Sequence, residues 1–156
     1  MDSHHKINCT VDALYGAGAS AYIPSDITMT YYRTGRIREV YHNGTLLCTL
    51  RIDGGLAITL DFARILLQCK DFDEYCIEVD DDAAPFVAEG KSVFASHVVR
   101  CGKYVRISSD VPILYNNDVI AVGRAVLSEP MIAGSRRGVV VRVRDSLKRR
   151  GRIFST

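Results

Sequence analysis

Apolar residues near the start of the chain recur at helical spacing. Four of them fall on one face of a helix: Ile7, Val11, Leu14 and Tyr15. We expect this helix over residues 6–15, with Gly16 ending it. Across residues 27–32 every second side chain is apolar instead, which predicts a half-buried strand.

A β-hairpin is expected next. Two apolar-rich segments, 37–41 and 45–52, flank Asn43-Gly44, a dipeptide that favours a tight turn because both central residues need a positive φ. In residues 60–69 the apolar positions again follow helical spacing, and Thr59 can cap the N-terminus of that helix.

Short strands dominate the second half of the chain. We expect a helix over residues 83–89 and strands at 92–101, 104–107, 111–115, 119–127 and 138–145. Short strands separated by turns at this spacing are typical of a small barrel. The sequence therefore predicts an α+β protein, with an N-terminal α/β module followed by a small pseudo-barrel.

The acidic run Asp80-Asp81-Asp82 separates the two halves. Residues 76–79 are expected to form the last strand of the first half, so we place the domains at 1–79 and 80–156. Asp82 suits the N-cap of the following helix, because a carboxylate stabilises the positive end of a helix. Three adjacent carboxylates do not have metal-ligand spacing, so a solvated linker is favoured over a metal site.

The composition indicates a globular protein outside the membrane. No apolar run approaches the ~18–20 residues of a membrane span. The polar N-terminus lacks the apolar core of a signal peptide. The five cysteines include no C-x-x-C pair, which favours reduced, mostly buried thiols over a disulfide framework. We therefore expect a cytoplasmic protein.

Motifs of the common enzyme classes are absent from the sequence. There is no G-x-S-x-G, Walker A, G-x-G-x-x-G or H-E-x-x-H motif. His97 has no Cys or Ser at motif spacing. A catalytic dyad that is assembled only in the tertiary structure is the alternative. We expect no catalytic residues, no metal and no cofactor.

Positive charge is concentrated towards the C-terminus. Residues 1–79 hold seven Lys or Arg against ten Asp or Glu, whereas residues 80–156 hold thirteen against eight. Arg142 and Arg144 alternate with valines, so on a strand both would point away from the core. Arginine forks suit phosphate groups, which makes this region a candidate nucleic-acid surface. A solvated edge strand with a basic tail is the alternative.

The helix expected over 83–89 meets the next strand at Gly90-Lys91-Ser92. Glycine ends the helix there and lets another backbone come close. A free backbone N–H beside Lys91 would make the junction a phosphate contact, and a plain helix C-cap is the alternative. Val93 and Phe94 should face opposite sides. We expect Phe94 to pack in the core, whereas an exposed Phe94 could stack on an unpaired base.

Both halves resemble segments of one known family. Three segments look like the domain that precedes the PUA module in archaeosine tRNA-guanine transglycosylases: 34–40 (TGRIREV), 44–55 (GTLLCTLRIDGG) and 58–66 (ITLDFARIL). Residues 85–95 (PFVAEGKSVFA) and 121–125 (AVGRA) resemble the PUA module itself. The resemblance covers about residues 33–145 and includes nothing similar to the family's catalytic barrel.

The resemblance implies RNA binding without base exchange. In PUA domains RNA lies against the first helix, the strand after it and the last strand, here residues 86–89, 91–97 and 139–145. The residues expected to contact RNA are Gly90, Lys91, Ser92, His97, Arg136, Arg142, Arg144 and Arg149. We expect substitution of Arg142 and Arg144 together to weaken RNA binding and to leave the melting temperature nearly unchanged.

The implied RNA is tRNA, bound near its acceptor end, in the context of archaeal archaeosine modification. A separately encoded catalytic transglycosylase chain is an implied partner. The alternative is an accessory or scaffold subunit, acting through protein contacts with a tRNA-modifying enzyme or the translation machinery.

Overall fold

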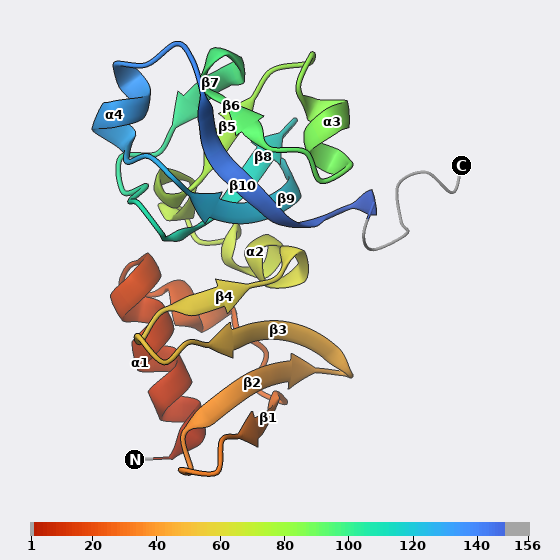
Figure 1. Ribbon diagram of the computed structural model, residues 1–156. Coiled ribbons are helices and arrows are strands. Elements are labelled where there is room, and N and C mark those ends of the chain that lie inside the picture. The colour runs from red at the N-terminus through yellow and green to blue at the C-terminus, as the bar shows by residue number, and fades with distance from the viewer. Residues whose placement is uncertain (1, 149–156) are drawn as a thin grey trace. The chain divides into compact units, whose positions relative to one another are not determined.

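Residues 2–148 are described by the computed structural model, and they fall into two units (Figure 1). The first unit ends at Phe72 and the second begins at Asp73. The sequence placed the boundary after residue 79, and the structure places it earlier in the chain, after Phe72. The difference arises because the strand β5 (Ile77–Val79) pairs with two later strands of the second unit. Local periodicity indicates a strand but does not say which sheet it joins.

Helices of the first unit begin at side-chain caps. The carboxylate of Asp2 accepts the backbone N–H three residues on at 2.7 Å and so begins α1 (Ser3–Tyr15). This helix ends before Gly16, whose φ is 101°. Thr59 caps α2 (Leu60–Leu66) in the same way, at 3.3 Å. Two short 3-10 turns are η1 (Ala19–Tyr22) and η2 (Phe72–Tyr75).

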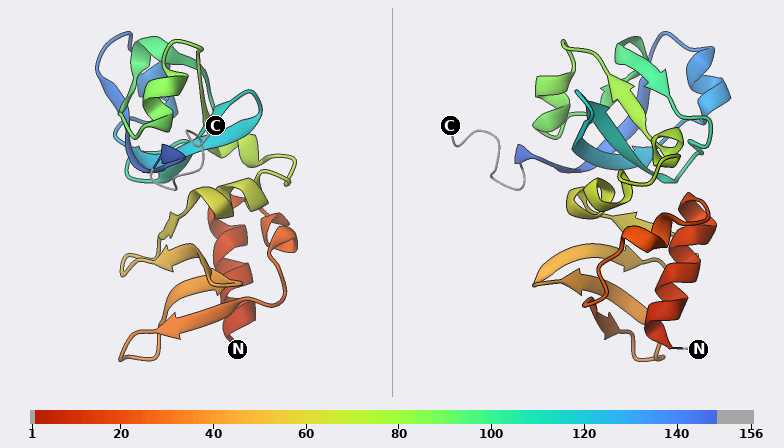
Figure 2. Two further views of the ribbon diagram at one scale, coloured as in Figure 1. Left: turned by 90° about the vertical axis from the view of Figure 1, so that its right-hand side faces the viewer. Right: turned by 180° about the vertical axis from the view of Figure 1, so that it is seen from behind.

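Four antiparallel strands form the sheet of the first unit, in the order β1-β2-β3-β4. Their bounds are β1 (Thr28–Tyr31), β2 (Ile37–His42), β3 (Thr45–Leu50) and β4 (Leu56–Ile58). Asn43 and Gly44 join β2 to β3 with φ values of 50° and 77°, as the hairpin prediction requires. One face of the sheet carries buried Val40, Cys48 and Ile58 in register, and α1 covers this unit's core (Figure 2).

Six strands form a nearly closed pseudo-barrel in the second unit, in the order β6-β10-β9-β8-β5-β7. Besides β5 they are β6 (Val93–Phe94), β7 (Val98–Cys101), β8 (Asp110–Tyr115), β9 (Asp118–Ala125) and β10 (Val139–Ser146). The β5–β8 pair is parallel and the other pairs are antiparallel. The α+β pseudo-barrel expected from the sequence is therefore confirmed.

Two of the expected strands of the second unit were wrong in detail. The strand expected over 92–101 is divided by the 3-10 turn η3 (Ala95–His97), so that β6 and β7 lie at opposite ends of the strand order. The segment 104–107 forms turns, not a strand. Its Val105 is nevertheless buried, and the carbonyl of Val105 accepts the N–H of Glu129 at 3.1 Å. An apolar residue can thus fill a barrel from a turn as well as from a strand.

The core of the second unit lies inside the barrel. Buried valines and isoleucines come from β5, β8, β9 and β10, among them Ile77, Val111, Ile113, Val140 and Val141. The helices α3 (Ala84–Ala88) and α4 (Glu129–Ala133) lie on different sides of the barrel in both figures (Figures 1 and 2). Each helix contributes buried side chains to this core, Val87 from α3 and Ile132 from α4.

Candidate nucleic-acid interface

The junction between α3 and β6 is closed by backbone hydrogen bonds. The N–H of Gly90 donates to Val87 and the N–H of Lys91 donates to Phe86, at 2.9 and 3.0 Å. These N–H groups are therefore engaged in ending the helix, and the expected free N–H for phosphate is wrong at these two positions. Gly90 has a φ of 104°, which a side chain would strain. What remains available at the junction is the exposed Lys91 side chain.

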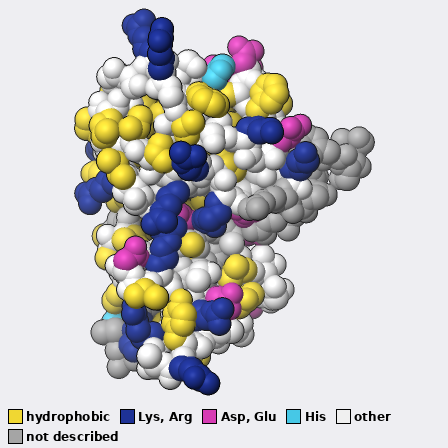
Figure 3. All heavy atoms as spheres, viewed as in Figure 1, with side chains coloured by type: hydrophobic (Ala, Val, Ile, Leu, Met, Phe, Trp, Pro, Cys, Tyr) yellow, Lys and Arg dark blue, Asp and Glu magenta, His cyan; other side chains and the backbone are white. Residues whose placement is uncertain are grey.

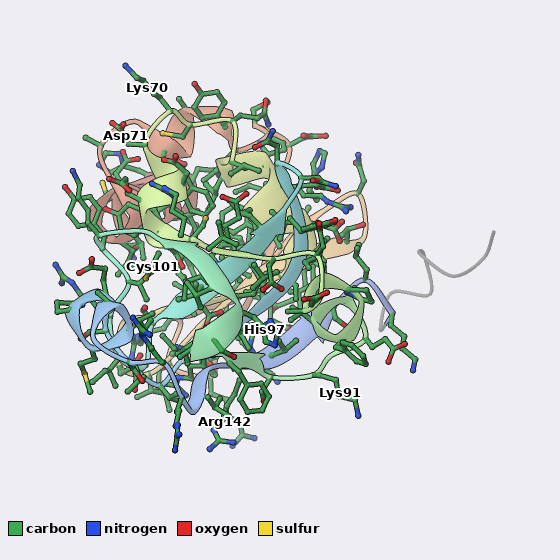
Figure 4. All side chains as sticks on the ribbon, turned by 90° about the horizontal axis from the view of Figure 1, so that it is seen from above. Lys70, Asp71, Lys91, His97, Cys101 and Arg142 are labelled. Carbon is green, nitrogen blue, oxygen red and sulfur yellow. The ribbon has the colours of Figure 1, made fainter. Side chains whose placement is uncertain are left out.

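An open pocket of about 440 Å³ lies beside this junction. Its lining comes from the turn before α3, from α3, from the junction and from β6 and η3: Asp82, Ala83, Phe86, Val87, Lys91, Ser92, Phe94 and His97. The sequence-predicted residues Lys91, Ser92 and His97 are thus brought together on one side of the barrel, and the view from above shows Lys91 and His97 there with Arg142 (Figure 4).

Two aromatic side chains of the pocket are exposed to solvent. Phe86 is 60% exposed and Phe94 is 48% exposed, whereas Val93 is buried. The register of β6 on β10 decides this, because Val93 pairs with the buried Val141 and so Phe94 must face outward. The expectation that Phe94 packs in the core is therefore wrong. An exposed aromatic ring beside a cation is the arrangement on which unpaired bases stack.

His97 is held by a carboxylate at the edge of this pocket. Its Nδ1 lies 3.0 Å from one carboxylate oxygen of Asp80 and 3.1 Å from the other. The hydrogen bond with His97 lowers the pKa of Asp80. Asp80 also accepts the N–H of Ala83 at 2.9 Å, so Asp80, not the expected Asp82, caps the turn that leads into α3. The orientation of His97 is thereby fixed, with its ring forming part of the pocket wall.

Arg142 stands on the outer face of β10, as the sequence predicts. It is exposed, and it lies directly opposite the exposed Arg124 of β9. The Arg124 Nε donates to the carbonyl of Ser108 at 3.1 Å, which holds this side chain over the loop before β8. On its other side Arg124 lies opposite Asp110 of β8, so the cross-strand row holds one carboxylate beside the two guanidinium groups. The two exposed arginines still offer positive charge on the outer surface, which a phosphate group can use.

Arg144 differs from Arg142 because it is only partly exposed and has an ion-pair partner. A β-bulge falls at this residue, because Val143 pairs with Gly123 while Asp145 pairs with Val122. The Arg144 guanidinium instead forms an ion pair with the buried carboxylate of Asp110. The alternation that predicted two outward arginines is broken by the extra residue of the bulge, and Arg144 is a structural ion-pair partner.

The other two predicted contacts lie elsewhere. Arg136 is exposed in the loop between α4 and β10, where it lines a second pocket of about 330 Å³ with β7 and α4. It is not among the residues that line the pocket beside Lys91. Arg149 lies outside the described residues.

Two residues of this surface, Phe86 and Arg124, were not selected from the sequence. The exposure of Phe86 could have been predicted from helical spacing. Ala83, Ala84, Val87 and Ala88 already make up the buried face of the helix, so Phe86 must lie outside that face.

In residues 2–148 no group of three or more His, Cys, Asp or Glu side chains is placed to hold a metal ion. None of the five cysteines forms a disulfide. Burial raises the pKa of Cys48 to about 12 and that of Cys101 to about 11, so these two thiols stay protonated at neutral pH. No helix of the described chain is both long and apolar enough to cross a membrane.

Comparison with protein families divides the chain in the same place as its fold. Residues 75–147 match the PUA domain, and residues 7–73 match the patch-forming domain C2 of tRNA-guanine transglycosylase. The chain carries a C2 domain followed by a PUA domain. The resemblance drawn from the sequence is thereby confirmed, and the pocket, Lys91 and the Arg124–Arg142 pair all belong to the PUA domain.

Curated relatives of the C2 and PUA domains are much longer proteins. The chain is 29% identical over 148 residues to a tRNA-guanine(15) transglycosylase of Methanothermobacter thermautotrophicus, and 30% identical over 152 residues to that of Methanobrevibacter smithii. These matches cover 92% and 95% of this chain but 23% of each relative. The chain is homologous to their C-terminal portion, and the matches do not extend to the rest of these relatives.

Solved structures share the fold over nearly the whole chain. A hypothetical protein from Pyrococcus horikoshii superposes with a TM-score of 0.70 at 15% identity, covering 92% of this chain and 89% of that one. A conserved PUA domain protein from Thermoplasma acidophilum gives 0.65 at 18% identity, covering 93% and 91%. Other chains of similar length therefore have this two-part fold.

Proposed function

We propose that this protein is a non-catalytic, cytoplasmic RNA-binding protein that recognises tRNA at its acceptor end, in the context of archaeosine modification. The observation that carries the proposal is the pocket of the PUA domain, where exposed Phe86 and Phe94 stand beside Lys91. The homology to the C-terminal portion of tRNA-guanine(15) transglycosylases supports tRNA as the RNA.

The chemistry of this surface fits a single-stranded end joined to a helix. Phe86 and Phe94 offer stacking faces, which only unpaired bases can use. Lys91 and the Arg124–Arg142 pair offer charges for the phosphates that follow. Asp82 and the His97 ring supply polar groups at the pocket wall for the edge of a flipped base. The unpaired 3′ end of tRNA, adjoining the acceptor helix, has both features.

The test compares deacylated tRNA with the same tRNA lacking its single-stranded 3′ end, each at two salt concentrations. Neutralisation of three phosphates gives a salt slope between about −2 and −3, so affinity should fall at least about twentyfold from 50 to 200 mM salt. Trimming should weaken binding to the level of a duplex of equal length. Affinity that is flat with salt, or equal for the two RNAs, would contradict acceptor-end recognition.

A second candidate function is suggested by the homology to an enzyme family. The chain is homologous to part of proteins named as transglycosylases, and in this second function it delivers tRNA to a separately encoded catalytic chain. Co-expression of this protein with such a chain, followed by size-exclusion chromatography with and without tRNA, tests this. A complex that forms without RNA supports the scaffold function, and separate elution under both conditions argues against it.

A further inference from the structure

One strand of the PUA domain has a free edge. Within residues 2–148, β7 is the last strand of its sheet and pairs only with β5. Just after β7, the N–H of Gly102 donates to the carbonyl of Cys76 at 2.8 Å, on the β5 side. Backbone groups alternate between the two sides of an antiparallel strand, so the N–H and C=O of Cys101 point away from β5. Such an edge is a template to which another extended segment can add.

A groove lies between this strand edge and residues 129–136, and is here called the β7 groove. It encloses about 330 Å³, with β7 on one side and α4 and the loop after α4 on the other. Ala95 and Ile132 are buried in its lining, so part of the lining is apolar. The helix lies beside β7 in Figures 1 and 2, and Figure 4 shows Cys101 of β7 away from Lys91. Proteins bind extended peptides at a strand edge beside a side-chain pocket, because backbone hydrogen bonds supply affinity and the pocket supplies specificity.

The rim of the β7 groove carries one available charge of each sign. Glu129 lies in the first turn of α4, and Arg136 is exposed in the loop that follows this helix. Within residues 2–148 neither side chain takes part in an ion pair. The guanidinium of Arg100 also lines the groove, but it is engaged by the carbonyl of Asp73 and the carboxylate of Glu74. Dark-blue side chains stand at the top of this domain in Figure 3, where Figure 1 shows the loop between α4 and β10.

The carboxylate of Glu129 decides between a peptide and RNA as the occupant. Burial, and after it the negative charge of Glu129, raises the pKa of Cys101 to about 11, so the carboxylate lies close to the free edge of β7. A negative charge at this point repels phosphate groups. RNA could therefore use only Arg136, whereas a polypeptide can satisfy both charges and the free backbone groups of Cys101 as well.

We propose that the β7 groove binds a short extended segment of a partner protein. The segment adds as a strand to β7 and carries a basic residue for Glu129 and an acidic residue for Arg136, on either side of an apolar residue. Val99 is the extra residue of a β-bulge, because Val79 pairs with Val98 while Glu78 pairs with Arg100. The bulge limits pairing to the part of β7 that follows it. This inference goes beyond RNA binding and does not rest on it.

The test titrates the ¹⁵N-labelled full chain with two peptides that differ only in the order of their charges. They are the capped heptapeptides TKTVTET and TETVTKT, whose two orders cover both directions in which a strand can add. Amide chemical shifts give the dissociation constants and mark the residues in contact. We expect one peptide to bind about tenfold more tightly than the other, because the second meets two like charges. The amide of Cys101 should be among the shifted signals.

A charge-exchanged variant makes the test specific to the β7 groove. Glu129→Arg with Arg136→Glu keeps the net charge and should reverse the preference between the two peptides. The control exchanges two exposed charges elsewhere in the same domain, Glu89→Arg with Arg106→Glu, and should keep the wild-type preference. Cys101→Pro removes an N–H that points away from β5, a position that tolerates proline on an edge strand, and should weaken both peptides at least about threefold. If this variant does not fold, the charge exchange still decides.

Each outcome supports or overturns the proposal. A reversal confined to the charge-exchanged variant supports the β7 groove. Equal binding of the two peptides, an unchanged preference after the exchange, or no shift of any groove signal at millimolar peptide overturns it. Displacement of the peptide by deacylated tRNA would assign the groove to RNA, and a Cys101 shift that depends on protein concentration alone would assign it to a second copy. Failure of tRNA binding would refute the proposed function and leave this inference standing, because the peptide titration involves no RNA.

Discussion

Substitution of Arg144 should destabilise the PUA domain, whereas substitution of its strand neighbour Arg142 should not. Arg144 forms its ion pair with Asp110, whose side chain is fully buried, while Arg142 is exposed on the outer face. We choose Arg144→Met and Arg142→Met, because methionine keeps the apolar stem and removes the charge. The expectation that both arginines could be replaced without change in melting temperature is thereby revised for Arg144.

The magnitude follows from the burial of the two partners. Removing one member of a fully buried ion pair costs about 3–5 kcal/mol, since the other charge remains in the interior. The Arg144 side chain is 38% exposed, so water screens part of the interaction and we expect about 2 kcal/mol. For a domain of this size about 2 kcal/mol lowers the melting temperature by roughly 10 °C. Arg142→Met should change stability by less than about 0.5 kcal/mol.

The assay is thermal and urea unfolding followed by far-UV circular dichroism, since the chain has no tryptophan. A double-mutant cycle with Asp110→Asn isolates the pair, and a coupling energy of about 1–2 kcal/mol is expected. Equal stability of the Arg144→Met and Arg142→Met proteins would refute the reasoning. The two variants should rank the other way in tRNA binding, where Arg142→Met should bind tRNA more weakly than Arg144→Met.

Three further outcomes are expected. Phe94→Ala should weaken binding of tRNA with an intact 3′ end roughly tenfold at unchanged melting temperature, because a base loses its stacking face. Gly123→Ala should cost about 2 kcal/mol in urea unfolding, because the new Cβ would lie 2.4 Å from the Arg142 carbonyl oxygen, whereas Gly134→Ala meets nothing closer than 3.7 Å and serves as control. The lowered pKa of Asp80 stabilises the fold above the usual carboxyl pKa of about 4, and this contribution is lost as pH falls further. Asp80→Asn should therefore show a smaller drop in melting temperature between pH 5 and pH 3 than the wild type.

Local chemistry made much of the fold predictable. Asn43-Gly44 needs a tight turn, Thr59 can cap a helix and Gly90 can end one, and each of these signals acts within a few residues. Lys91 and Ser92 could be selected for the same reason, because they lie at the end of one helix, whereas His97 was selected through the family resemblance. The exposure of Arg142 could be predicted from the alternation of side chains along a strand, and this alternation holds as far as Val143.

Other features depended on contacts between distant segments. Phe94 faces outward because Val93 pairs with Val141 of the last strand, and β5 joins the second unit because it pairs with β7 and β8. The ion pair of Arg144 joins residues 34 apart in sequence. Periodicity states which neighbours face opposite ways, but a bulge or a barrel corner decides which face is inside. The sequence by itself therefore determined the order of two domains, most of their local elements and the region of the proposed RNA surface. The tertiary structure decided which arginine and which aromatic residue that region exposes, because strand register is set by the partner strand.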